Sequence, residues 1–280
     1  MDLSATQPPV LPPVDAAAQA RLAGVDAGGL EGAAPSAVLE WVREKFAGGR
    51  GKRAIFTTGF GMEGCAMIDM IARVDGGAGR GETVIHYLDT HFLFAETHRL
   101  RDKLEQRYPS VRFVNAGTTL TPEQQAAAFG PALWETDPDA CCGLRKVEPM
   151  RALLRDADVW VTALRREQST TRAAIRTVEW DEAFEVIKVS PLAYWSREQV
   201  WAYVREHAIP YNELHDLAYP SVGCTHCTRP VEGARPEDYS RDGRWAGTGK
   251  TECGLHFRGR SQANVRLSVE GKGEGEKGVE

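Results

Sequence analysis

RAIFTTGFG, residues 53–61, passes from an apolar run directly into a turn that contains two glycines. Residues 53–57 combine apolar and β-branched side chains over a length typical of a buried strand. The apolar residues that follow at 65–72 predict a helix. A strand that runs through a tight turn into a helix is the first half of a β-α-β unit.

The same alternation continues along the chain. Further strands are predicted at 83–88, 111–114, 157–164 and 184–189, and further helices at 36–46, 94–108, 147–154 and 196–207. Strands that alternate with helices favour a mostly parallel sheet covered on both faces. The expected fold class is therefore α/β with a doubly wound sheet.

Composition excludes several classes of protein. The chain has 280 residues, of which 42% are hydrophobic and 26% charged, with a net charge of -5. This charge gives no sign of a nucleic-acid or membrane surface, and no apolar run approaches the roughly 20 residues that span a membrane. The first residues lack the basic start and apolar run of a secretion signal. We therefore expect a cytoplasmic protein with reduced thiols, whose clustered cysteines serve metals or chemistry.

Two predicted strands end in residues that suit a nucleotide. The first strand ends in Thr57 and Thr58, followed by Gly59 and Gly61, where backbone N–H groups and a helix N-terminus can bind an anion. The second strand ends in Leu88 and Asp89, where a carboxylate could accept hydrogen bonds from ribose or adenine. An ordinary tight turn and a helix N-cap are the alternatives. Because ligands of open α/β sheets bind at the carboxyl ends of strands, we expect both ends to face one site.

Four of the six cysteines form two close pairs. Cys141 and Cys142 are adjacent, and Cys224 and Cys227 form a Cys-x-x-Cys pair. Such pairs bind zinc or iron–sulfur clusters or act as redox couples. Adjacent cysteines normally point apart, which suits the spaced corners of a [4Fe–4S] cluster better than one tetrahedral zinc ion. We expect a [4Fe–4S] cluster, with a four-thiolate zinc site and disulfides as the alternatives.

The two remaining cysteines lie in different settings. Cys65 lies in an apolar stretch and is interpreted as a core residue. Cys253 lies in KTECGLH, residues 250–256, between Lys250 and His256. Nearby positive groups favour the thiolate, which is the reactive form of cysteine. A catalytic thiol and a stray surface cysteine both remain open from this segment alone.

Arginines gather at predicted loops and strand ends around these motifs. They are Arg165, Arg166, Arg172, Arg229, Arg241 and Arg244. Arginine binds phosphate and sulfate oxygens in a bidentate fashion, and Lys146 adds a cation beside the first cysteine pair. A solvated surface accounts for any one of them, but the set predicts a site for an anionic ligand.

Several segments together resemble the assimilatory adenylylsulfate (APS) and phosphoadenylylsulfate (PAPS) reductase family. They are KVEPM at 146–150, LRREQS at 164–169, YPSVGCTHCTR at 219–229 and ECGLH at 252–256. The resemblance covers most of the chain and implies an adenine nucleotide α-hydrolase-like (PP-loop) fold. Members with both cysteine pairs use APS and members without them use PAPS, so APS is expected, with PAPS or dual specificity as the alternative. One departure is His91, where the family often has glycine.

The resemblance also implies a mechanism. Cys253 would attack the sulfur of APS, with His256 assisting, to give an S-sulfocysteine and AMP. Thioredoxin or a glutaredoxin-like donor would then release sulfite by thiol exchange. The phosphosulfate is expected to contact Lys146, Arg166, Arg172, Arg241 and Arg244, and the AMP part is expected to contact Thr57, Thr58, Gly59, Gly61, Leu88 and Asp89. A homo-oligomer is compatible with the sequence.

Two other hypotheses about the function compete with this one. An ATP-consuming PP-loop enzyme typically carries a Ser-Gly-Gly-x-Asp-Ser loop, which residues 58–63 do not match. A non-enzymatic iron–sulfur sensor or zinc module leaves Cys253 and the arginines without a role.

The expected organisation has three parts. Residues 1–34 form a flexible N-terminal arm, because they have too few large apolar residues to bury. Residues 35–240 form the α/β nucleotide-binding and iron–sulfur domain. Residues 241–280 form a C-terminal catalytic segment followed by a disordered tail.

Overall fold

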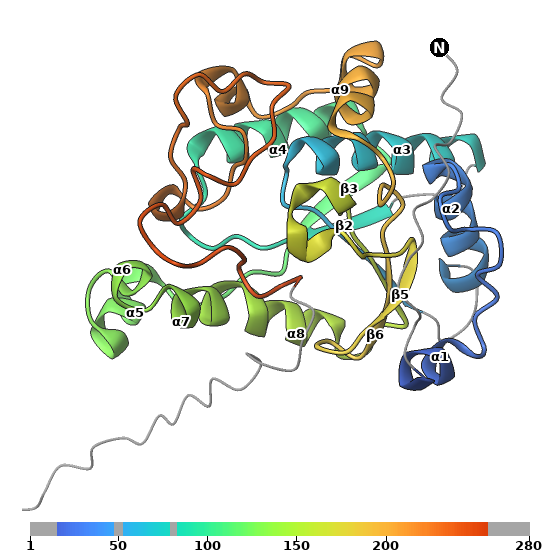
Figure 1. The fold of residues 1–280 in the computed structure, drawn as a ribbon, viewed down its shortest axis with the longest axis horizontal. Coiled ribbons are helices and arrows are strands. Elements are labelled where there is room, and N and C mark those ends of the chain that lie inside the picture. The colour runs from blue at the N-terminus through green and yellow to red at the C-terminus, as the bar shows by residue number, and fades with distance from the viewer. Residues whose placement is uncertain (1–15, 48–52, 79–82, 257–280) are drawn as a thin grey trace, which may run out of the picture.

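The computed structural model describes residues 16–47, 53–78 and 83–256. Six strands in these ranges form one sheet in the order β3-β2-β1-β4-β6-β5 (Figure 1). The strands are β1 (Ala54–Thr57), β2 (Thr83–Tyr87), β3 (Val111–Asn115), β4 (Val159–Val161), β5 (Val178–Asp181) and β6 (Val186–Val189). β5 pairs with β6 in the antiparallel sense, and the other neighbours pair in parallel. The predicted α/β class with a mostly parallel sheet is confirmed.

The strand order reverses beside β1. The chain passes from β1 outward through β2 to β3, and then returns to place β4 on the other side of β1. Both β2 and β4 are parallel to β1, so the carboxyl ends of all three strands meet at one edge of the sheet. In open α/β sheets this reversal is the place where ligands bind.

Helices flank the sheet. They are α1 (Ala16–Leu22), α2 (Pro35–Val42), α3 (Met62–Ala78), α4 (Ala95–Arg107), α5 (Pro122–Phe129), α6 (Leu133–Thr136), α7 (Pro138–Cys142), α8 (Glu148–Leu154) and α9 (Arg197–Glu206). Figure 1 shows α3, α4 and α9 on one side of the sheet and α8 on the other. Among the described residues, no helix combines the length and the apolar character needed to cross a membrane.

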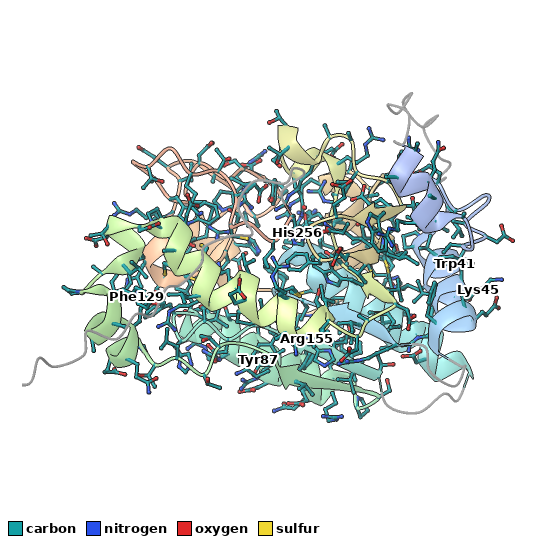
Figure 2. The ribbon with its side chains drawn as sticks, turned by 90° about the horizontal axis from the view of Figure 1, so that it is seen from below. Trp41, Lys45, Tyr87, Phe129, Arg155 and His256 are labelled. Atoms are coloured by element: carbon teal, nitrogen blue, oxygen red, sulfur yellow. The ribbon has the colours of Figure 1, made fainter. Side chains whose placement is uncertain are left out.

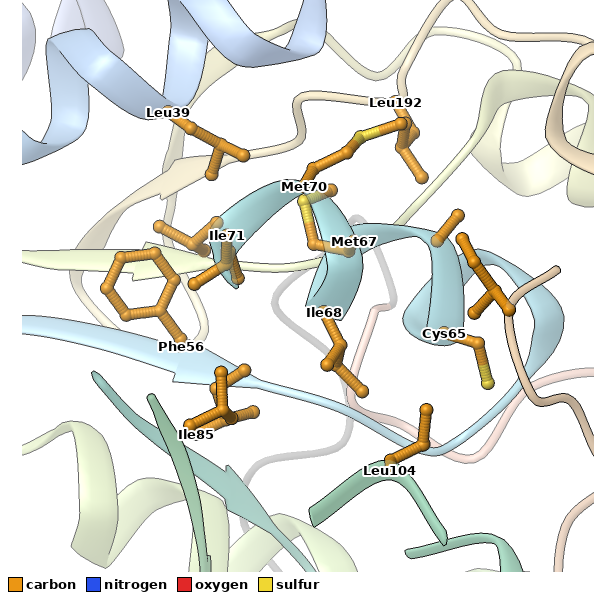
Figure 3. Close-up of a cluster of buried hydrophobic side chains, with 14 of the residues drawn as sticks. Leu39, Phe56, Cys65, Met67, Ile68, Met70, Ile71, Ile85, Leu104 and Leu192 are labelled. Atoms are coloured by element: carbon orange, nitrogen blue, oxygen red, sulfur yellow. The ribbon is translucent and has the colours of Figure 1, made fainter. Parts of the chain in front are cut away.

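Neighbouring residues of β1 serve the two faces of the sheet. Phe56 belongs to a large apolar cluster with Ile68 of α3 and Leu104 of α4, part of which Figure 3 shows. Ile55 packs in a second cluster with Met150 and Leu154 of α8. Because side chains alternate along a strand, one short apolar run supplies both cores.

Most predicted elements occur, with shifted ends. β4 and β6 are shorter than the predicted strands at 157–164 and 184–189. α2 begins at Pro35, since proline suits the first helical position, and the helical path continues to Ala47. α3 extends well beyond the predicted 65–72 because its polar residues have buried partners, as Asp75 does with Arg43. β5 and the short helices α5–α7 were not predicted.

The second half of the predicted N-terminal arm has defined contacts. Residues 1–15 lie outside the described residues. Trp41 of α2 donates a hydrogen bond from Nε1 to the carbonyl of Asp26, at 2.9 Å. The N–H of Gly32 donates to Thr177 Oγ1 at 3.2 Å, and the N–H of Thr177 donates to Glu31 Oε1 at 2.9 Å. Residues 26–32 therefore contact both α2 and the segment before β5.

Candidate active site

A cavity of about 260 Å³ lies at the carboxyl ends of β1 and β4, where the strand order reverses. The turn after β1, the end of β2, the segment before α8 and the C-terminal loop contribute to its walls. Most of the residues predicted to bind substrate or react line it: Thr57, Thr58, Gly59, Gly61, Leu88, Lys146, Arg172, Arg241, Arg244, Cys253 and His256. The structure thus brings the two strand ends, the cations and the free thiol to one place.

The turn between β1 and α3 is fixed by Thr58. Its N–H donates to the carbonyl of His86 at 3.0 Å, and its Oγ1 accepts from the N–H of Phe60 at 3.0 Å. A Cβ added at Gly64 would lie 2.6 Å from this Oγ1, so Thr58 occupies its position because residue 64 has no side chain. The turn presents backbone and the N-terminus of α3 at the cavity, a combination that suits an anion.

Two predicted substrate residues, Asp89 and Arg166, lie outside the cavity lining. Asp89 instead shapes its own loop, since its Oδ1 accepts from the N–H of His91 at 2.8 Å. Arg166 donates from Nε to the carbonyl of Ala173 at 2.7 Å. His91 has a φ of 59°, in the left-handed region that favours glycine, at the position where the sequence departs from the resembled motif.

Cys253 is partly buried at the cavity. Burial and the charge of Glu252 disfavour its thiolate, but Lys146, the backbone N–H of Leu255 and Arg172 outweigh them and lower the pKa of the Cys253 thiol. Cys65 shows the opposite case, since burial and the charge of Glu63 raise its thiol pKa far above the usual value. The surroundings of Cys253 thus favour the reactive thiolate form, whereas those of Cys65 suppress it.

The residues around Cys253 anchor it on both sides. Glu252 precedes it and forms a buried ion pair with Arg172, with Nη2 of Arg172 2.8 Å from Oε2 of Glu252. Gly254 follows with a φ of 90°, and a Cβ there would meet Val147 at 3.2 Å. Leu255 packs against the apolar cluster of α8. The thiol is therefore held between a polar anchor and an apolar one.

His256 lies near the centre of the molecule, as Figure 2 shows. Its ring stacks on Trp160 of β4, with centroids 5.2 Å apart and planes at 19°. Burial, with the nearby charges of Lys188 and Arg172, lowers the pKa of His256 well below its usual value, so the ring is neutral near pH 7. Its Nδ1 is buried without a hydrogen-bond partner among the described residues. A neutral imidazole stacked on an indole is better suited to anchoring the C-terminal segment by packing than to donating a proton.

Cations crowd around Trp245 beside the cavity. The guanidinium carbons of Arg244 and Arg241 lie 4.6 and 5.3 Å from its ring centroid, and Lys250 Nζ lies 5.7 Å away. Lys250 also pairs with Asp139 of α7. Trp245 is buried, so its ring faces hold the three positive side chains in fixed directions. Lys250 and Arg241 are paired with carboxylates, so Arg244 is the cation of this group that is left for an anionic ligand among the described residues.

The paired cysteines approach one another from two segments. Cys141 and Cys142 end α7, while Cys224 precedes a short 3₁₀ turn (Thr225–Cys227) and Cys227 is its last residue. Burial and the charges of Cys224 and Cys227 raise the pKa of Cys141 to about 11, which shows that the thiols share one electrostatic environment. All four are free thiols.

The four paired cysteines are the residues that would hold the expected metal group. Four thiols that converge are chemically suited to an iron–sulfur cluster. Among the described residues, no three His, Cys, Asp or Glu side chains are grouped closely enough to hold a metal ion. The residue types thus suit a cluster, while the side-chain positions favour neither a cluster nor a zinc ion.

Sequence reasoning missed a buried charge network at the cavity. Glu63, near the start of α3, lies 2.9 Å from Arg165 Nε and 3.4 Å from Arg197 Nη1. Burial alone would raise the pKa of Glu63, but the two arginines outweigh it and lower the pKa. Glu63 and Arg197 line the cavity. The sequence carried no clear signal for it, because a carboxylate in the first turn of a helix is common and Glu63 occupies that position in α3.

Comparison with known proteins identifies the family. A family model described as "Phosphoadenosine phosphosulfate reductase domain" matches residues 53–230, which is more than half of the chain. The chain belongs to this family. The matched range contains all six strands and both cysteine pairs, and it ends before Cys253. The predicted family is thereby confirmed.

Similar proteins extend the match. "Adenosine 5'-phosphosulfate reductase" of Shouchella clausii is 42% identical over 219 residues, which cover 78% of this chain and 86% of that protein. The protein of the same name from Geobacillus thermodenitrificans is 45% identical over 220 residues, covering 79% and 88%. A crystal structure of PAPS reductase from Candida auris, in complex with phosphate, aligns with a TM-score of 0.59 and 27% identity over 79% of this chain and 100% of that one.

Proposed function

We propose that this chain reduces APS to sulfite and AMP in sulfate assimilation, with Cys253 as the nucleophile. The observation that carries the proposal is a thiol of lowered pKa at a cavity built on the strand reversal and lined by cations. Two relatives that are more than 40% identical to this chain are named for the same reaction. The chain would then be an oxidoreductase that acts on a sulfur group.

In the first step the Cys253 thiolate attacks the sulfur of the sulfate group. A bond forms between the two sulfur atoms, and the anhydride bond from sulfur to the bridging oxygen breaks. AMP leaves with the electron pair of that bond, and Cys253 carries an S-sulfo group. Lys146 stabilises the attacking thiolate, whose pKa it lowers.

In the second step a reduced dithiol protein, thioredoxin or a glutaredoxin-like donor, regenerates the enzyme. One of its thiolates attacks Sγ of Cys253, and sulfite leaves with the electron pair of the sulfur–sulfur bond. The second thiol of the donor then breaks the mixed disulfide and frees Cys253. The two electrons that reduce the sulfur come from the donor. The segment at 241–256 must open for this step, since a protein reaches Cys253 only from outside the cavity.

The nucleotide is assigned to the strand ends. The turn at Thr57–Gly61 and the backbone of Leu88 would contact the AMP part, because both line the cavity beside the reversal. Lys146 and Arg244 would contact the phosphosulfate oxygens. Asp89 and Arg166 are assigned no direct contact, since neither lines the cavity.

A [4Fe–4S] cluster is proposed on Cys141, Cys142, Cys224 and Cys227. When bound, it supplies a fixed negative charge beside Lys146 and joins α7 to the 3₁₀ turn. Lys146 would remain charged there, because thiolate charges outweigh burial and raise its pKa. Iron and sulfide analysis of protein purified without oxygen, with an equivalent analysis for zinc, tests this assignment.

The substrate assignment is tested by comparing APS with PAPS. The relatives that are 41–45% identical carry the APS name, whereas the aligned PAPS reductase structure is 27% identical. We expect sulfite release with reduced thioredoxin to be much faster with APS than with PAPS at equal concentrations. Equal or faster turnover of PAPS would contradict the assignment.

A further inference from the structure

The carboxylate of Glu252 is held more firmly than a surface ion pair would be. Its side chain is 4% exposed. Oε2 accepts from Arg172 Nη2 at 2.8 Å, while Oε1 accepts from Arg172 Nε at 3.1 Å and from Ser169 Oγ at 3.2 Å. Thr171 Oγ1 also donates to Oε1, at 3.4 Å. A two-pronged arginine contact with further hydroxyl donors fixes both the position and the orientation of a carboxylate.

Arg172 and Arg241 are both engaged by the chain itself. The remaining donor of Arg172, Nη1, contacts Gln168 Oε1 at 2.6 Å. Arg241 donates from Nε and Nη2 to the carbonyl of Thr251, at 3.1 and 3.0 Å, and its Nη2 lies 3.3 Å from Glu252 Oε2. The two arginines thus hold the two residues that precede Cys253.

Lys146 and Arg244 differ from that pair. Both line the cavity, and within the described ranges neither has a carboxylate partner. Arg244 donates from Nε to the carbonyl of Cys227 at 3.3 Å, which leaves its terminal nitrogens for a ligand. Of the five lysine and arginine side chains that line the cavity, two are therefore open to an anion and two hold the segment of the nucleophile, while Arg197 is paired with Glu63.

We propose that Glu252 is a positioning residue, whose ion pair with Arg172 directs the Cys253 thiol at the sulfur of the substrate. The inference rests on the proposed function. It also gives Arg172 a different role from the one expected from the sequence, because Arg172 acts on the reaction through Glu252 and not on the phosphosulfate. With Leu255 and His256 anchored on the other side, Cys253 lies between two fixed points.

The ion pair persists when substrate is bound. A substrate anion that displaced Glu252 from Arg172 would leave a buried carboxylate without its cation, which is strongly unfavourable. Lys146 and Arg244 offer an incoming anion a contact without that cost. Release of the Glu252–Arg172 pair belongs instead to the second step, when the segment opens to the donor protein.

The test compares Glu252→Gln with Asp242→Asn in the full-length protein purified without oxygen. Asp242 is an exposed acid in the same loop, so the control removes the same charge near Arg241. In Glu252→Gln we expect S-sulfocysteine formation in a single turnover to slow by about 100-fold, the effect of a displacement of roughly 1 Å in a reacting group. The Kd of APS should change by less than about threefold, because the contacts that bind the substrate before reaction are not altered.

Alkylation of Cys253 by iodoacetamide gives a readout that needs no substrate. Because Glu252→Gln releases the segment, we expect Cys253 to react faster than in the wild type, although its chemistry with APS is slower. The rates are compared on the high-pH plateau, where the thiol is ionised in both proteins, since loss of the Glu252 charge also lowers the thiol pKa. The variant Arg172→Met/Glu252→Met removes both buried charges, so it should fold as the wild type does and still show slow transfer.

The outcomes separate the alternatives. A loss of APS affinity in Glu252→Gln, with an unchanged rate of S-sulfocysteine formation from bound APS, would mean that Arg172 contacts the substrate directly. That result would overturn the proposal. Faster transfer in Glu252→Gln would make Glu252 a competitor of the substrate, and would overturn it as well. Unchanged alkylation and transfer would show that the pair does not position Cys253. Failure of the wild type to form S-sulfocysteine would instead contradict the proposed function, while the alkylation result would stand.

Discussion

Replacing Glu63 by glutamine tests the buried charge network beneath the cavity. Glu63 is the carboxylate between Arg165, whose side chain is 0% exposed, and Arg197, whose side chain is 6% exposed. Glutamine has the same shape but no charge, so two buried guanidinium groups would lose their shared buried counter-charge, and Arg165 would keep only the exposed Glu167, at 3.0 Å. Breaking a buried ion pair from one side costs about 3 kcal/mol or more.

This loss of unfolding free energy should lower the melting temperature by a measurable amount. At about 2–4 °C per kcal/mol for a domain of this size, the Tm should fall by about 6–12 °C in differential scanning calorimetry at pH 7. Glu213→Gln is the matched control, because Glu213 forms an exposed pair with Arg99 and its loss should leave Tm nearly unchanged. Equal melting temperatures for the two variants would refute the reasoning.

The pH dependence of this effect has a definite sign. The folded-state pKa of Glu63 is lowered, because Arg165 and Arg197 outweigh burial. Its contribution to stability is therefore complete above the unfolded-state pKa of about 4 and is lost as the pH falls through the folded-state value. The difference in Tm between wild type and Glu63→Gln should be full at pH 7 and shrink below about pH 4.

Two further predictions concern the nucleophile and the turn after β1. Lys146→Met should raise the pKa of the Cys253 thiol, because Lys146 is the strongest of the groups that lower it. The curve of alkylation rate against pH should therefore shift to higher pH. An unshifted curve would exclude this role of Lys146. Gly64→Ala should weaken APS binding and destabilise the fold by about 1–3 kcal/mol, the usual cost of overpacking, since the new Cβ meets Thr58 Oγ1. Thr58→Gly should restore stability to Gly64→Ala, and a double variant as unstable as the single one would show that the clash lies elsewhere.

The parallel core of the fold could be predicted from local pattern. β1, β2 and β3 are short apolar runs followed by turn residues, and their ends differ from the predicted ends by one residue. β5 could not be predicted in this way. It is a half-exposed edge strand, and its residue Asp181 is paired with Lys188 of β6, so it lacks an apolar run. Its pairing is visible only once β6 is in place.

The candidate site was predictable where strand geometry brings residues together. A parallel sheet brings the carboxyl ends of its strands to one edge, and β1 and β2 are neighbours, so Thr58 and Leu88 line one cavity as the strand ends suggested. The partners of Glu63 and Glu252 were not predictable, because Arg165 and Arg172 lie 102 and 80 residues away along the chain. A sequence shows that a cation is present, but not which carboxylate it meets.

The central claim is that Cys253 carries the sulfo group between the two steps. The most direct measurement is mass spectrometry of the protein after anaerobic incubation with APS and no reductant. We expect the peptide containing Cys253 to gain the mass of one sulfo group, in proportion to the AMP released, and to lose it when reduced thioredoxin is added. Release of AMP and sulfite without this adduct, or full activity of Cys253→Ser, would contradict the account.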